Sequence, residues 1–230
     1  MNSYILYTPG RCGSISVQTS LKNKGITSYL FHNHRDSYSI DGILREVEAT
    51  EIFNAKYLFV EKLLSSEDKN RVITLIRDPM DRAISAFTYF YSFYRPGLTP
   101  TRRKAQFIKE YPHKWYLEFF TQFQQLFPVN VLSLIKDNTE RCWSMETSKS
   151  IIVVGKCPYF KELETRLKGV FGLDVQIPHM NKSKVYKDVY TELHNNKYPE
   201  ELISSIYSSQ LVSTLFSPQE IQEAKDKWVQ

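Results

Sequence analysis

Long apolar runs are missing from this chain of 230 residues. A helix that crosses a bilayer needs about 20 predominantly apolar residues, so we expect no transmembrane segment. The opening stretch MNSYILYT has neither a basic head nor a cleavage site, so no signal peptide is expected either.

Cysteine is scarce as well. Cys12, Cys142 and Cys157 lie far apart in the sequence, and none belongs to a CxxC pair. An odd number of widely spaced cysteines disfavours a disulfide scaffold and a zinc site built from cysteine alone. This pattern favours a reducing compartment, and we expect a cytoplasmic protein.

The charge is only mildly unbalanced. Thirty Lys and Arg residues against 25 Asp and Glu residues give a net charge of +5. This balance suits an anionic ligand or a polyanionic substrate. The basic residues are scattered and no RNA- or DNA-reading motif is present, so nucleic acid is not an expected partner.

Strands and helices alternate through the first two thirds of the chain. Strands are expected at Tyr4–Thr8, Thr27–His34, Val72–Ile76, Val129–Leu134 and Ile151–Val154. Helices are expected at Ser14–Lys24, from Asp78-Pro79 to about Tyr94, at Phe107–Phe127, at Tyr159–Phe171, and from Lys184 on with breaks at Pro199 and Ser217-Pro218. The segment Arg95–Lys104 is expected to be an exposed connector.

This alternation predicts an α/β protein with a mainly parallel central sheet covered on both faces and a helical C-terminal third. No composition shift marks a domain boundary, so residues 1–230 are expected to form a single domain. The strand, turn and helix at the start of the chain are laid out like a phosphate-binding loop, and we expect a three-layer fold of the P-loop NTPase type.

The first loop, in YILYTPGRCGSIS, has the layout of an anion site. A helix that starts directly after a strand and a tight turn presents unpaired N–H groups to a negative charge. Gly13 lets the backbone close around an anion, Ser14 and Ser16 add hydroxyl donors, and Arg11 adds a positive charge. The Walker pattern GxxxxGK[ST] is absent. The alternative is an ordinary turn in which Ser14 or Ser16 caps the helix.

A second possible anion site lies in VITLIRDPMDRAIS. Arg77 ends a predicted strand, Asp78-Pro79 opens a helix, and Ser85 lies on that helix. A guanidinium makes two parallel bonds to a phosphate, to which a serine hydroxyl adds a third. Alternatively, Arg77 pairs with Asp78 or Asp81 and Ser85 is a packed helix residue. Two such sites at one sheet edge suggest a ligand phosphorylated at two places.

Together these segments resemble the sulfotransferases that use 3′-phosphoadenosine-5′-phosphosulfate (PAPS). The family pattern R-[DN]-P-x-x-R-x-x-S is matched by Arg77, Asp78, Pro79, Arg82 and Ser85. The resemblance implies that Arg77 and Ser85 hold the 3′-phosphate of PAPS, which is a co-substrate, and that no metal is required.

In the first loop, the family usually has lysine-x-glycine-serine/threonine-x-serine/threonine. This chain departs from that pattern at the lysine, with the residues Arg11, Cys12, Gly13, Ser14, Ile15 and Ser16. The resemblance implies that these residues hold the 5′-phosphosulfate. Arg11 is then expected to stabilise the leaving phosphate as well as to bind it.

The predicted strand ending in FHNH carries His32 and His34, which face the same side of a strand. The pair is similar to the His-x-His strand of the uronyl/heparan 2-O-sulfotransferases and of bacterial proteins of capsular polysaccharide synthesis. The resemblance implies that His34 is the general base and that His32 assists it. Alternatively, the histidines are structural, or they hold a metal with Cys12 or Asp36 as a third ligand.

Other segments resemble the same bacterial group, namely HKWYLEFF, PHMNKSKVYKDVY and YSSQLVSTLFSPQEIQEAKDKW. Lys182 and Lys184 in the second of them are placed to reach the 3′-phosphate or an acidic saccharide, or are simply solvated. We therefore expect transfer of a sulfuryl group from PAPS to a hydroxyl of a carbohydrate or polysaccharide, with anionic acceptors included. The alternatives are a non-catalytic nucleotide-binding protein of polysaccharide synthesis and an atypical P-loop small-molecule kinase.

Overall fold

The computed structural model describes residues 3–32, 69–94, 99–110, 119–121, 123, 124, 126, 127, 129–178 and 187–229. The chain divides into two compact units. The sheet unit is formed by Met1–Ile76, Phe119–Val129 and Arg141–Met180, and the helical unit by Arg77–Glu118, Asn130–Glu140 and Asn181–Gln230. The single-domain organisation stays a prediction.

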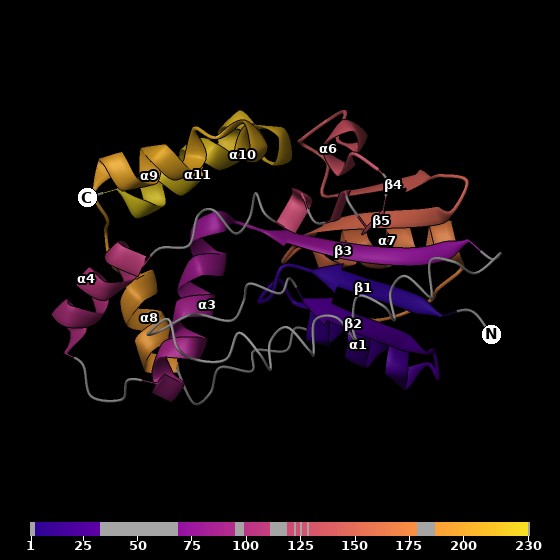
Figure 1. The fold of residues 1–230 in the computed structure, drawn as a ribbon, viewed down its shortest axis with the longest axis horizontal. Helices are drawn as coiled ribbons and strands as arrows, with labels where there is room; N and C mark the ends of the chain where they lie inside the picture. Colours follow the sequence, from indigo (N-terminus) through magenta and orange to yellow (C-terminus); the bar gives the residue numbers. More distant parts are fainter. Residues whose placement is uncertain are drawn as a thin grey trace. The chain divides into compact units, whose positions relative to one another are not determined.

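The sheet has the strand order β2-β1-β3-β5-β4 (Figure 1). Its strands are β1 (Tyr4–Thr8), β2 (Ser28–His32), β3 (Asn70–Arg77), β4 (Cys142–Glu146) and β5 (Ser150–Cys157). β1 pairs in parallel with both β2 and β3, whereas β4 runs antiparallel to β5. The expectation of an α/β protein with a mainly parallel sheet is confirmed.

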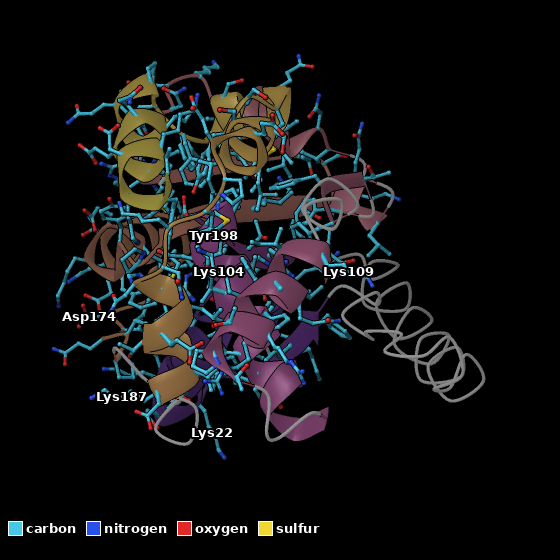
Figure 2. The ribbon with its side chains drawn as sticks, turned by 90° about the vertical axis from the view of Figure 1, so that its left-hand side faces the viewer. Lys22, Lys104, Lys109, Asp174, Lys187 and Tyr198 are labelled. Carbon is cyan, nitrogen blue, oxygen red and sulfur yellow. The ribbon has the colours of Figure 1, made fainter. Side chains whose placement is uncertain are left out.

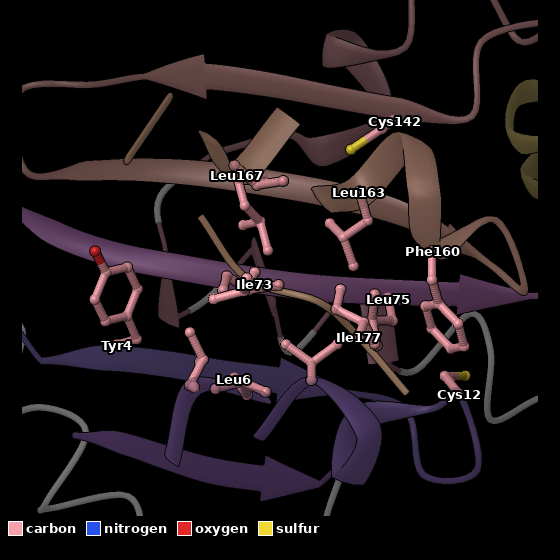
Figure 3. Close-up of a cluster of buried hydrophobic side chains, with 14 residues drawn as sticks. Tyr4, Leu6, Cys12, Ile73, Leu75, Cys142, Phe160, Leu163, Leu167 and Ile177 are labelled. Carbon is pink, nitrogen blue, oxygen red and sulfur yellow. The ribbon is translucent and has the colours of Figure 1, made fainter. Parts of the chain in front are cut away.

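One face of the sheet is packed against α1 (Ser14–Asn23) and α7 (Phe160–Phe171). Alternate residues of β1 and β3 face this layer, because successive side chains of a strand point to opposite faces. Figure 3 shows Leu6, Ile73 and Leu75 beside Leu163 and Leu167 of α7 in one buried cluster. The amphipathic pattern of these helices is therefore explained by burial on the sheet.

The opposite face is covered by aromatic side chains from residues 119–127. The ring of Tyr7 in β1 stacks on Phe119 with centroids 5.3 Å apart, and it meets the rings of Phe123 and Phe127 edge-on at 5.8 Å. Aromatic pairs at these separations add to the energy of burial. The sheet is thus covered on both faces, as the sequence predicts.

The strand expected at Val129–Leu134 is wrong. Val131–Leu134 forms the short helix α6, because the side chain of Asn130 accepts a hydrogen bond from the Leu132 N–H at 3.0 Å and caps the turn. The strand that pairs with β5 is instead β4, whose sequence CWSME carries no continuous apolar run. The strand conformation of β4 thus depends on its pairing with β5 and not on the apolar pattern of its own sequence.

The helical unit contains α3 (Pro79–Tyr94), α4 (Pro100–Glu110), α8 (Lys187–His194), α9 (Glu200–Tyr207), α10 (Gln210–Leu215) and α11 (Pro218–Trp228). The predicted breaks are confirmed, since Pro199 precedes α9 and Ser217 forms a capping box with Glu220 at the start of α11.

The expected connector Arg95–Lys104 is wrong from Pro100 on, where α4 begins. Phe107 of α4 is buried against the rings of Phe87 and Tyr198, each with its centroid 5.4 Å away. Lys104, labelled beside Tyr198 in Figure 2, holds its ammonium 5.7 Å from the centre of that ring. Burial of one helix face outweighs the loop-like composition of the helix start. None of the helices within the described ranges has the length and apolar character that spanning a membrane requires.

Candidate functional site

The loop after β1 turns sharply between Thr8 and Ser14. Arg11 and Gly13 both adopt the left-handed conformation, with φ of 70° and 84°. Such a conformation costs a non-glycine residue about 1–3 kcal/mol. Left-handed residues next to ordinary ones form the concave N–H arrays that bind anions. The loop is therefore a tight turn with two left-handed residues, and its role as an anion site stays a prediction.

Gly13 is fixed by close packing as well as by its φ. A Cβ atom at this position would lie 2.8 Å from Cζ of Phe160 and 3.4 Å from Sγ of Cys157. Next to it, Cys12 is fully buried and its thiol lies 3.8 Å from the Gly10 carbonyl oxygen. Figure 3 shows Cys12 beside Phe160 at the end of the buried cluster. The loop is thus held against the first turn of α7.

The alternative in which Ser14 or Ser16 caps α1 is wrong. Gly13 is the N-cap and makes no side-chain cap bond, and both serines lie inside the first turn, where they are buried. The carbonyl of Gly13 accepts from the N–H groups of Ser16 at 3.0 Å and Val17 at 3.4 Å. A helix start without a capping side chain leaves its first N–H groups to water or to a ligand.

Asp78 caps the helix that follows β3. Its Oδ1 accepts from the Asp81 N–H at 2.9 Å, and Pro79 occupies the first helical position, as the sequence predicts. Arg77, the last residue of β3, is half-buried and donates from Nη2 to the Tyr190 hydroxyl at 3.2 Å. Ser85 lies in the second turn of α3 and is 7% exposed.

Two carboxyls at the start of α3 have opposite pKa shifts. Burial and the charge of Asp81 raise the pKa of Asp78 to about 6, although the hydrogen bond from Tyr207 acts to lower it. Burial also acts to raise the pKa of Asp81. However, the hydrogen bond from His194 and the charges of Arg77 and Lys227 bring the Asp81 pKa down to about 2. Asp81 is therefore the ionised partner of the surrounding cations.

Side chains from the C-terminal helices complete this cluster, and the sequence did not predict them. His194 Nε2 and Lys227 Nζ both reach Oδ1 of Asp81, at 3.2 Å and 3.3 Å. The Tyr207 hydroxyl donates to Oδ2 of Asp78 at 2.6 Å. The spacing of Tyr190 and His194, four residues apart on an expected helix, was the available signal. It does not say which helix faces them.

The histidine pair starts at the end of β2. His32 is the last residue of that strand and is paired in register with Thr8, the last residue of β1. The backbone of His32 thus lies beside the strand end from which the first loop departs. The side chain of His32, all of His34, and both Lys182 and Lys184 lie outside the described residues.

Metal ligands do not gather in the described ranges, where no three His, Cys, Asp or Glu side chains form a possible metal site. Cys12, Cys142 and Cys157 are not joined in a disulfide.

The chain was compared with family models, curated proteins and solved structures. No family model, no curated protein and no solved structure matches the chain.

Proposed function

We propose that this chain is a PAPS-dependent sulfotransferase with a P-loop NTPase-like fold. It transfers a sulfuryl group to a hydroxyl of a carbohydrate or polysaccharide. One observation supports the proposal: two strand–turn–helix segments, each carrying an arginine, leave the paired parallel strands β1 and β3. In open α/β sheets, ligands bind beyond the carboxyl ends of such strands.

The first loop is proposed to hold the 5′-phosphosulfate. The left-handed conformations at Arg11 and Gly13 and the uncapped start of α1 support this role. The N–H groups of residues 12–15, the hydroxyls of Ser14 and Ser16, and the Arg11 guanidinium are the proposed donors. The N–H of Ser16 is already bonded to the Gly13 carbonyl. Charge grows on the departing phosphate during transfer, and these groups stabilise it there.

Arg77 and Ser85 are proposed to bind the 3′-phosphate. Their match to the family pattern supports this role, as does the position of Arg77 at the end of β3. Lys182 and Lys184 are proposed to add positive charge at the same phosphate or at an acidic acceptor.

The proposed reaction is a direct in-line transfer. The acceptor oxygen forms a bond to sulfur while the bond from sulfur to the bridging phosphate oxygen breaks, and 3′-phosphoadenosine-5′-phosphate (PAP) leaves. The proton of the acceptor hydroxyl goes to the imidazole of His34, with His32 orienting the base or the sugar. The leaving group is already an anion, so the proposed step requires no metal. The position of His32 at the end of β2, beside the end of β1, supports this assignment.

The proposal is tested by binding and transfer measured on the same preparations. We expect tight binding of PAP without magnesium, and transfer of labelled sulfuryl from PAPS to members of a panel of acidic and neutral polysaccharides. His34→Ala is expected to keep PAP affinity and to lower the transfer rate by about 10²–10⁴-fold. Equal affinity for PAP and adenosine 5′-phosphate would reject the donor site. A requirement for ATP and magnesium would favour a kinase, and PAP binding without any transfer would favour a non-catalytic role.

A further inference from the structure

In the hydrogen bond between Arg77 and Tyr190, the donor and the acceptor are unambiguous. A guanidinium is a donor only, so the Tyr190 oxygen accepts from Arg77 Nη2 at 3.2 Å. The phenol keeps its own O–H proton, and within the described ranges no acceptor takes it. Tyr190 therefore has a donor for a further partner beside a cation that is proposed to bind phosphate.

The ring of Tyr190 is held in place from within the helical unit. It stacks on the imidazole of His194 with centroids 5.3 Å apart and an interplanar angle of 29°. His194 in turn pairs with Asp81 on α3. Because α8 and α3 lie side by side (Figure 1), these contacts fix the hydroxyl relative to Arg77.

The charges around Tyr190 suit an anion despite two nearby carboxylates. Asp81 pairs with His194 and Lys227 and also interacts with the charge of Arg77, and Asp78 receives hydrogen bonds from the Asp81 N–H and Tyr207. Arg77 is the cation that contacts the phenol directly. A phosphate held by Arg77 would be within reach of the Tyr190 proton, and a bond from a neutral donor to a charged acceptor is among the stronger ones.

We propose that Tyr190 binds the same anionic group as Arg77. Its hydroxyl donates a hydrogen bond to an oxygen of the 3′-phosphate. This inference rests on the proposed function and adds a residue to its 3′-phosphate site. His194 and Asp81 act as positioning residues for the Tyr190 ring.

The test compares PAP with adenosine 5′-phosphate by calorimetry on the whole chain. The ratio of the two affinities measures the contribution of the 3′-phosphate. Tyr190→Phe keeps the ring and its stack on His194, and we expect it to lower this ratio about tenfold while leaving the affinity for adenosine 5′-phosphate unchanged.

Tyr207→Phe is the matched control, since it removes a different hydroxyl bonded to the same Arg77-Asp78-Pro79 segment. We expect it to leave the ratio unchanged. An equal fall of the ratio in both variants would overturn the ligand role and indicate general support of the segment. A preference for PAP that Tyr190→Phe does not alter would reject the role of Tyr190 alone. No preference for PAP in the unaltered chain would reject both the donor site and this addition to it.

Discussion

The loop after β1 and the segment after β3 are built in different ways. The first is shaped by its own backbone, with left-handed Arg11 and Gly13 and a close contact to Phe160. The second has an ordinary capped helix start and depends on side chains that come from distant helices, namely Tyr190, His194 and Lys227.

This difference determines which changes each region tolerates. A loop shaped by its backbone is sensitive to a single added carbon atom. The close-packed neighbours leave no room for the backbone to shift and relieve the strain. A region built from side chains has several contacts that can be removed one at a time. Its response also depends on pH, because carboxylates carry the contacts.

The largest expected effect is that of Gly13→Ala. The new Cβ is strained at φ 84° and would lie 2.8 Å from Phe160, so we expect a loss of about 2–4 kcal/mol of unfolding free energy. Gly25→Ala is the matched control, since Gly25 has φ 69° but no atom within 4 Å of the added carbon. It should cost only about 1 kcal/mol in urea unfolding. Equal losses in the two variants would show that the contact with Phe160 does not contribute to the cost of Gly13→Ala.

Asp78→Asn should change the pH dependence of stability by about 2–3 kcal/mol. The pKa of Asp78 in the folded chain, about 6, lies above its ordinary value of 3.8. The folded state therefore binds the extra proton between these values, and this contribution to stability is lost as the pH rises from about 4 to above 6. The variant lacks this loss, so its stability relative to the unaltered chain should improve from pH 4 to pH 7. A constant difference across that range would contradict the shift.

Asp81→Asn is expected to cost about 2 kcal/mol at pH 7. Here the folded pKa of about 2 lies below the ordinary value of 3.8, so the stabilisation is present above 3.8 and is lost as the pH falls toward 2. The deficit of the variant should therefore shrink on acidification in thermal unfolding scans. A deficit that persists at pH 2 would indicate a packing effect and not the ion pairs.

Tyr207→Phe should have the smallest effect, about 1 kcal/mol, because it removes one hydrogen bond and retains the ring. The loss should be larger above pH 6 than at pH 4, since the hydroxyl then binds an ionised carboxylate. Chemical unfolding at both values measures this. The same loss at both pH values would mean that Asp78 does not change its charge between them.

The sequence predicted the parts of the fold that local patterns control. β1, β3 and β5, the cap of α3 by Asp78, and the breaks at Pro199 and Ser217 follow from apolar runs and from the chemistry of Asp, Ser and Pro. Local patterns do not predict β4, because its pairing with β5 determines it. They do not distinguish α6 from a strand either, because four residues do not establish a period.

The candidate site divides in the same way. Arg11, Gly13 and Arg77 can be proposed from the sequence because turn chemistry and strand ends are local features. The wrong assignment of the α1 cap arose because serine is the commoner choice, whereas the contact with Phe160 requires glycine. Tyr190, His194 and Lys227 were missed because tertiary contacts select them.

The central claim is that Arg11 and Arg77 bind opposite ends of one adenosine donor. The most direct measurement is calorimetry of Arg11→Ala and Arg77→Ala with PAP and with adenosine 5′-phosphate. Arg77→Ala should weaken PAP binding about 10- to 100-fold and leave adenosine 5′-phosphate unaffected, whereas Arg11→Ala should weaken both nucleotides. Equal losses for both nucleotides in Arg77→Ala would contradict the claim.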